Sequence, residues 1–497
     1  MVIALSLTLG GGTHTGFLAD TVLQLASIPL LMLAGSRSLE ALAAGGSEAD
    51  GARLWLMVCA SIIVVALVQL VPLPEPIWRN LAAEQAVEIL RKGSHPVAGW
   101  GQLSIAPYST WAALTSTYVP LAVFGGTCLL GPRQRLLLCW VIVCLLAFGL
   151  ALGFAQDAGG PSSPLRLFEE TNPNDADGFF ANRNHFAASL YCALLLASAP
   201  TVTIMHRMEG RAHGIEVLWF ALALAFLLAV VAGLALARSR AGVLLTMPAI
   251  VGVLTVLALE QTSRPEQGTR KPPRSHRLAW ATLAGAVVLA LIFGLQRIQS
   301  RFESDPLDEL RIPYAVTTLH EAWSALPLGS GLGTFVPVYA LAEKQSDLYP
   351  VFANRAHNDI LEALLEGGLL SLAMLAAFLG WYAYIARRIW RAHPHAIEGH
   401  AALQRAAYVV VGLLLLHSLV DYPLRTAALS AVFAFCCGVL VRAPHASRHG
   451  THGRPASAQR SGPPPPSPRS HIKWGNGMVW PENWQKLRSV STDDGAD

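Results

Sequence analysis

The stretch from Leu136 to Phe154 reads LLLCWVIVCLLAFGLALGF and contains no charged side chain. An α-helix rises about 1.5 Å per residue, so an apolar run of about 20 residues crosses the hydrocarbon core of a bilayer. Similar runs recur along most of the 497 residues, of which 53% are hydrophobic and 14% are charged. A soluble domain typically carries about 25% charged residues. The sequence therefore predicts an all-α, polytopic bundle of transmembrane helices.

Twelve membrane-spanning segments are predicted, or eleven if residues 1–10 do not form one. Residues 1–10 lack the basic start and the cleavage site of a signal peptide, and we interpret them as the end of a helix whose start is missing. The predicted segments are 1–10, 16–35, 53–73, 111–130, 136–154, 185–204, 216–236, 241–259, 278–296, 358–386, 403–420 and 427–441.

The distribution of arginine and lysine in short loops predicts the orientation of the bundle. The side rich in these residues is assigned to the cytoplasm, and the side with the acidic segments 157–177 and 303–309 is assigned to the exterior. The cytoplasmic set is Arg37, Arg53, Arg133, Arg135, Arg207, Arg211, Arg264, Arg270, Lys271, Arg274, Arg277, Arg387, Arg388 and Arg391.

Three external segments are long: 74–110, 155–184 and 297–357. The first carries apolar residues from Ile77 to Ile89 at helical spacing, which predicts a helix in the membrane interface. The third is too long for a simple connection, because such segments are usually functional. The transmembrane domain is therefore expected to cover residues 1–442, with 297–357 as a large external loop.

The remaining composition excludes several classes of protein. The net charge of +4 lies largely in the tail 443–497, which is rich in proline, serine and arginine and is expected to be disordered and cytoplasmic. Nucleic-acid binding is not predicted. All the cysteines lie in apolar segments and are expected to be core residues without a disulfide framework; they are Cys59, Cys128, Cys139, Cys144, Cys192, Cys436 and Cys437.

Polar clusters interrupt the apolar sequence at five places, all on the predicted external side. Ionisable residues in membrane segments are rare and commonly functional. The clusters are Asn182-Arg183-Asn184-His185, Arg238-Ser239-Arg240, Arg311, Arg355-Ala356-His357-Asn358, and Asp421-Tyr422-Pro423-Leu424-Arg425 after His417.

Arg238 and Arg240 are candidates for an anion site, since a guanidinium group binds phosphate oxygens in a forked geometry. Arg240 is expected to begin a helix, where the helix dipole also favours an anion. Alternatively, Arg238 and Arg240 extend to the lipid headgroups, and Arg311 forms a surface ion pair with a neighbouring acid.

His357 precedes a predicted helix, with Asn358 or Asp359 as its N-cap. The dipole at that helix start disfavours a proton on the imidazole, which would leave it able to act as a base. Glu362, one turn further, is expected to orient the ring or to favour its protonation. The alternative is an interfacial histidine bonded to a loop carbonyl.

Metal and nucleotide sites are not predicted. The sequence has no HExxH and no Walker loop, and the glycine-rich turn 327–333 lacks the βαβ context of a dinucleotide site. Asp175 and Asp177 form only a pair of carboxylates in an acidic loop. An enzyme built on this sequence is expected to need no cofactor and no metal.

The pattern resembles the O-antigen ligase and Wzy-type polymerase family of bacterial membrane glycosyltransferases. The similar segments are Gly178 to Ala187, Ser239-Arg240-Ala241-Gly242, Arg311 with Trp323, Pro327 and Gly329/Gly331/Gly333, His357-Asn358 with Glu362, Glu366 and Gly367, and His417 to Arg425. The resemblance spans roughly residues 16–441, whereas the tail is not expected of the family.

The resemblance implies a GT-C-like fold in the bacterial inner membrane with its active site facing the periplasm. It implies a glycan on undecaprenyl diphosphate as donor and the lipid A core or a second glycan as acceptor. By the same resemblance, Arg240 and Arg311 would bind the diphosphate and His357 would be the general base. Asn182, Asn184, Arg238, Asn358, Glu362 and Asp421 are the expected supporting residues.

Three alternatives remain open at this point. A polymerase of surface polysaccharide would share these motifs with a ligase, and an oligosaccharyltransferase acting on glycoproteins is a weaker possibility. A secondary transporter would explain many spans, but it predicts internal repeats and charges at the bilayer midplane. The sequence shows no clear repeat, and its ionisable clusters gather on one face.

Overall fold

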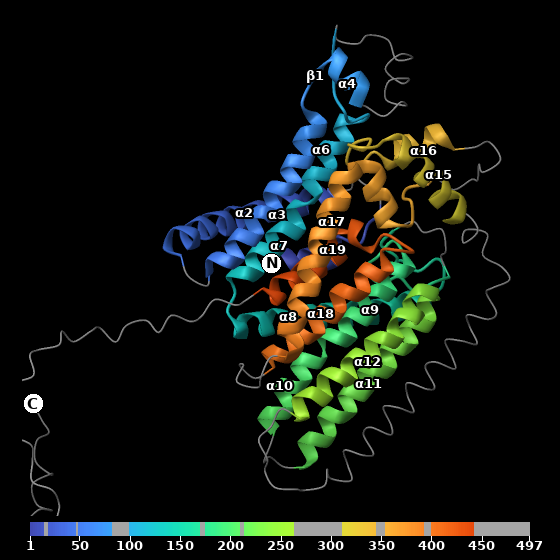
Figure 1. Cartoon of the computed structure of the whole chain (residues 1–497). Helices are drawn as coiled ribbons and strands as arrows, with labels where there is room; N and C mark the ends of the chain where they lie inside the picture. Colours follow the sequence, from blue (N-terminus) through green and yellow to red (C-terminus); the bar gives the residue numbers. More distant parts are fainter. Residues whose placement is uncertain are drawn as a thin grey trace, which may run out of the picture. The chain divides into compact units, whose positions relative to one another are not determined.

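The computed structural model describes residues 1–13, 18–45, 48–81, 99–168, 174–208, 213–262, 311–343, 353–391 and 399–441. These residues are almost entirely helical, which confirms the predicted all-α class (Figure 1). The helices of the first half are α1 (Val2–Leu9), α2 (Leu18–Ala44), α3 (Glu48–Leu70), α4 (Glu75–Leu81), α6 (Pro107–Ser116), α7 (Tyr118–Leu129), α8 (Pro132–Ala158), α9 (Arg183–Leu196) and α10 (Ser198–Met208).

The second half continues the bundle and ends on a short helix. Its helices are α11 (His213–Ala237), α12 (Arg240–Thr262), α15 (Arg311–Ser324), α16 (Phe335–Ala342), α17 (Asp359–Arg391), α18 (His400–His417), the 3-10 helix η2 (Pro423–Arg425) and α19 (Ala427–Leu440). The short strands β1 (Leu73–Pro74) and β2 (Trp100–Gly101) pair antiparallel, with Leu73 opposite Gly101.

Eight helices of the described residues are long and apolar enough to cross a membrane. The predicted total of about twelve stays a prediction, because 278–296 lies outside the described part of the chain. Helix α1 has eight residues, or about 12 Å at 1.5 Å per residue, which is too short to span a bilayer. Its Val2, Ile3 and Leu7 are instead buried in the core.

Helix α9 is the central helix of the bundle, and every residue from Asn184 to Leu196 is buried. A helix that is apolar on all sides is expected at such a position. Small residues allow its neighbours to approach closely. A Cβ added at Gly242 of α12 would lie 2.4 Å from the Cβ of Ala187, and one at Gly153 of α8 would lie 2.7 Å from Phe186. The N-terminus of α9 is therefore held firmly between several helices.

Arg135 was predicted to be a loop charge on the cytoplasmic side, but its side chain is fully buried. Its guanidinium donates to the carbonyl oxygens of Leu130 at 2.9 Å and Val441 at 2.8 Å. These carbonyls belong to helix ends that lack intrahelical partners. Arg388 donates in the same region to the carbonyl of Leu440. Arg135 and Arg388, two of the arginines used to predict the orientation of the bundle, therefore bind the carbonyl groups at helix ends.

Helix α17 is interrupted at Gly368, where φ is 58° and ψ is −146°. The carbonyls of Leu365 and Glu366 before the break accept hydrogen bonds from the backbone of Ser330 at 2.8 Å and Gly331 at 3.0 Å. The predicted glycine-rich turn 327–333 therefore supplies the donors that the broken helix requires. In a membrane protein, irregular backbone needs such internal partners.

The structure describes only part of the long segments that were predicted outside the membrane. Helix α4 begins the predicted interfacial helix, whose continuation beyond residue 81 lies outside the described residues. The predicted external loop 297–357 contains α15 and α16, and its residues 297–310 and 344–352 are not among those described. The tail 443–497 also falls outside them, so its disorder stays a prediction.

We expect Gly368→Ala to destabilise the protein. A Cβ at this position would lie 2.2 Å from the Pro327 carbonyl oxygen, and φ is unfavourable for alanine. Such strain costs about 1–3 kcal/mol, which would appear as a lower melting temperature in detergent. Gly380→Ala is the matched control, because nothing lies within 4 Å of a Cβ there. Equal melting of the two variants would contradict a structural role for the break.

Candidate functional site

His357 lies in a strained backbone conformation immediately before α17. Its φ is 52°, a value that non-glycine residues rarely adopt and that costs about 1–3 kcal/mol. The next residue, Asn358, accepts hydrogen bonds through Oδ1 from the backbone of Ile360 and Leu361, both at 3.0 Å. Asn358 is thus the N-cap, which confirms one of the predicted alternatives. The helix cap at Asn358 and the strained backbone of His357 together fix the point from which the imidazole side chain extends.

Asp421 holds the His357 ring from across the site. Its fully buried carboxylate lies 3.1 Å from His357 Nδ1 and accepts from Asn184 Nδ2 at 2.6 Å and from the Tyr422 backbone at 3.0 Å. Since an ionised carboxylate only accepts, His357 donates through Nδ1, which leaves Nε2 with a lone pair in the neutral ring.

The carboxylate of Asp421 is kept ionised by this environment. Burial acts to raise its pKa, but the hydrogen bond from His357 and the nearby positive charges outweigh that effect and hold the pKa well below its ordinary value. Arg311 is one of these charges. Asp421 therefore presents a fixed negative charge to the ring of His357.

Aromatic rings enclose the imidazole of His357. Tyr422 meets it edge-on with ring centroids 5.0 Å apart, and Tyr314 of α15 stacks at 6.2 Å. Asn182, the N-cap of α9, donates to the Tyr422 hydroxyl at 3.5 Å. Burial and the charge of Asp421 raise the pKa of Tyr422 above its ordinary value, so its hydroxyl stays neutral. These contacts restrict the ring to one orientation.

Arg311 lies beside this cluster. It begins α15, and its Nη1 donates to the carbonyl of Val420 at 3.2 Å, one residue before Asp421. The segment that begins with Arg311 therefore reaches the neighbour of Asp421, the hydrogen-bond partner of His357. The alternative of a surface ion pair with Asp305, Asp308 or Glu309 involves residues outside the described part.

Arg240 begins α12 at the same end of the bundle. Ser239 accepts through Oγ from the Gly242 backbone at 3.0 Å and thereby caps the helix. Gly242 packs directly on Ala187, two residues after His185 in α9. The N-termini of α9 and α12 are therefore adjacent, and Arg240 lies where they meet.

Arg238 forms an ion pair within the protein, whereas the sequence suggested an anion site. Its φ is 51°, and its Nη1 lies 3.4 Å from the buried carboxylate of Asp175, which Arg183 also contacts at 2.6 Å. Arg166 pairs with Asp177 at 3.2 Å. Arginines thus neutralise both acids that were weighed as metal ligands. A polar pocket of about 410 Å³ adjoins them, lined by Asp157, Gly160, Pro161, Arg166, Asn174 and Arg238.

Glu362 does not orient His357, contrary to the sequence-based expectation. Its buried carboxylate contacts Arg355 Nη1 at 2.8 Å and accepts from the Ala356 backbone at 3.1 Å. Arg355, which had no predicted role, is therefore its partner. The error arose because the sequence displays neighbours along a helix, whereas Asp421 lies 64 residues from His357 in the chain.

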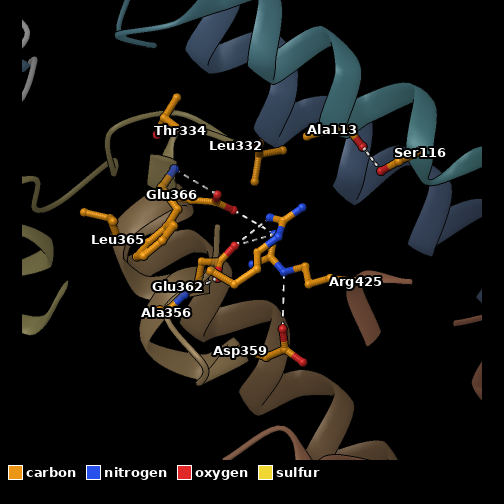
Figure 2. Close-up of polar contacts among 12 residues, drawn as sticks. Ala113, Ser116, Leu332, Thr334, Ala356, Asp359, Glu362, Leu365, Glu366 and Arg425 are labelled. Carbon is orange, nitrogen blue, oxygen red and sulfur yellow. Dashed lines mark hydrogen bonds and ion pairs between the residues drawn. The ribbon is translucent and has the colours of Figure 1, made fainter. Parts of the chain in front are cut away.

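Arg425 is a second residue whose role the sequence did not indicate. Figure 2 shows its guanidinium among three carboxylates of the first half of α17. It lies 2.9 Å from Glu366, 3.3 Å from Asp359 and 3.6 Å from Glu362. Burial acts to lower the pKa of Arg425, but the three carboxylates outweigh it and raise that pKa. The network ties η2 to the helix that follows His357.

Two buried histidines complete the surroundings of Asp421. His185 meets Tyr422 edge-on at 4.9 Å, and His417 Nδ1 lies 3.0 Å from the hydroxyl of Tyr191. The sequence analysis named both histidines in or beside polar clusters but predicted a role for neither. Among the described residues, no group of three or more His, Cys, Asp or Glu is placed to hold a metal; metal independence stays a prediction.

Part of this chain matches a known protein family. Residues 223–376 match the sequence profile of the O-antigen ligase family. The matched segment contains Arg240, Arg311 and His357. No curated protein matches the chain. The match confirms the predicted resemblance over this segment, and it supports a multi-pass membrane enzyme of polysaccharide biosynthesis, ligase-like or polymerase-like.

We expect Arg425→Gln to lower the melting temperature strongly. The substitution leaves Asp359 and Glu366 without their cationic partner, and breaking a buried ion pair costs on the order of 3 kcal/mol. Arg387→Gln is the control, because Arg387 is an exposed residue of α17. Thermal unfolding in detergent, followed by loss of the monodisperse chromatographic peak, measures both. Identical curves would show that Arg425 does not hold the helix.

Proposed function

We propose that this protein transfers a glycan from a polyprenyl diphosphate to an acceptor hydroxyl at the periplasmic face of the bacterial inner membrane. The observation that supports this most directly is the cluster of His357, Asp421 and Arg311. It combines an oriented imidazole, a fixed carboxylate and a cation at one end of a membrane bundle. That combination suits removal of a proton beside a departing anion.

In the proposed reaction, the acceptor hydroxyl oxygen attacks the anomeric carbon of the donor sugar. A new carbon–oxygen bond forms, and the bond from that carbon to the diphosphate oxygen breaks, its electron pair leaving with the lipid diphosphate. His357 Nε2 takes the hydroxyl proton. Asp421 at Nδ1 keeps the ring in the required tautomer and stabilises the resulting imidazolium, as a carboxylate does in other histidine bases.

Arg311 and Arg240 are the proposed diphosphate ligands. Charge-assisted hydrogen bonds from guanidinium groups stabilise an anionic leaving group without a metal ion. Arg240 additionally occupies the start of α12, where the helix dipole favours negative charge.

The other predicted residues act through these groups. Asn184 holds Asp421, Asn182 contacts Tyr422, and Asn358 caps the helix after His357. Arg238 and Glu362 are positioning residues in their own ion pairs, at 3.4 Å to Asp175 and 2.8 Å to Arg355. None of these needs to touch the substrate.

We expect His357→Ala to reduce glycan transfer by roughly 10²- to 10⁴-fold, because a positioned base contributes about that much. Asp421→Asn is expected to reduce it as well, since an amide cannot stabilise an imidazolium. His320→Ala is the control, a histidine of α15 whose side chain is 79% exposed. Transfer is measured in membranes with matched protein levels. Full activity of the His357 variant would exclude it as the base.

The glycolipids of a deletion strain separate a ligase from a polymerase. We propose a ligase whose acceptor is the lipid A core, so its loss should leave bare core while lipid-linked polymer accumulates. Loss of a polymerase would instead leave core capped by a single repeat, or no polymer. Electrophoresis of lipopolysaccharide distinguishes these patterns, and complementation with the wild-type gene is the control.

A further inference from the structure

Helix α15 carries an apolar stripe on its outer surface. Ile312, Val316, Leu319 and Trp323 follow one another at intervals of four, three and four residues, which places them on one face of a helix. Their exposed fractions are 72%, 61%, 48% and 74%. At a helical rise of about 1.5 Å per residue, the stripe extends for roughly 16 Å from Ile312 to Trp323. So large an ordered apolar surface usually marks an interaction site.

The stripe is fixed in its outward orientation. The opposite face of α15 is buried through Tyr314, Thr318 and Ala322. Tyr314 and Ala322 belong to the core shared with α16 and α17. Figure 1 shows α15 at the outer side of α17. The helix cannot turn its apolar face inward without withdrawing Tyr314 from His357.

The partner of this stripe must itself be apolar. Between Ile312 and Trp323 the only acidic side chain is Glu321, which is buried, and the exposed polar residues His320 and Ser324 lie along one edge. The stripe therefore offers no charge to a polar ligand. Its composition of aliphatic residues with a terminal tryptophan is typical of a helix in a membrane interface.

Continuity with a membrane-spanning helix indicates which apolar partner is present. Arg311, next to Ile312, donates to the carbonyl of Val420 just beyond the end of α18. There Leu416, Leu419 and Val420 expose 51%, 46% and 45% of their surfaces. Helix α18 is long and apolar enough to span the membrane. The apolar surface that this helix presents to lipid thus continues onto α15.

We propose that α15 lies in the outer boundary of the bilayer, with its apolar stripe among the acyl chains of membrane lipids. The inference goes beyond the proposed glycan transfer and does not depend on it. Where transfer occurs as proposed, this contact keeps Arg311 at the depth of lipid phosphate groups. A lipid-linked diphosphate would then meet the cation without leaving the membrane.

A photoactivatable diazirine amino acid placed at Val316 of the full chain tests this proposal in native membranes. Illumination should give lipid adducts, identified by mass spectrometry, in a yield comparable with Val251. Val251 is a residue of α12 with 61% exposure and serves as the positive control. Ser324 is also exposed on α15 but lies off the stripe. The same probe placed at Ser324 should therefore give no lipid adducts.

Each outcome decides the proposal. Lipid adducts at Val316 and Val251 but not at Ser324 support it. Adducts of Val316 to protein alone, whether this chain or another, overturn it, as does absence of lipid adducts at Val316 while Val251 reacts. A second measurement compares how strongly brominated lipids quench the tryptophan fluorescence of the wild type and of Trp323→Phe. Failure of the His357 test would leave these results unchanged.

Discussion

A buried negative charge at Asp421 is the constraint on which the arrangement of the site depends. An ionised carboxylate without water requires several donors, since its desolvation is otherwise very costly. Here the donors come from Asn184 at the start of α9, from the backbone of Tyr422 and from the ring of His357. Segments far apart in the chain must therefore meet at one carboxylate. Contacts of Asn358 with Leu419 and of Asp359 with Ser418 extend the same junction.

Arg425, four residues after Asp421, adds a positive charge beside this junction. Asp421 holds His357, two residues before α17, whereas Arg425 holds Asp359, Glu362 and Glu366 within the helix. The short segment around η2 thus fixes both sides of the helix start. The break at Gly368 isolates this first part of α17 from the long apolar part that follows. The position of His357 is consequently set by the contacts of Asp421 and Arg425 rather than by the long apolar part of α17.

The sequence predicted those features that depend on local pattern. Apolar runs located the long helices of the described residues, and the polar interruptions included Asn182, Asn184, His357 and Asp421, which the structure brings close together. The pairing within that group could not be predicted, because the His357–Asp421 contact joins residues 64 positions apart. Glu362 was chosen for His357 from helical spacing alone. Likewise Arg135 resembled a loop charge, and only the packed structure shows the carbonyls of other helices that bind it.

The same local device begins two of the helices that meet at the site. Arg238 and His357 are the non-glycine residues with positive φ in the described part of the chain, and each is followed by a capping residue, Ser239 or Asn358. The left-handed residue turns the chain sharply, so that a capped helix N-terminus follows at once. Helix N-termini carry partial positive charge. Strain at these turns, held by Asp175 and Asp421, therefore directs helix dipoles and basic side chains to the same region, an electrostatic environment that favours an anion.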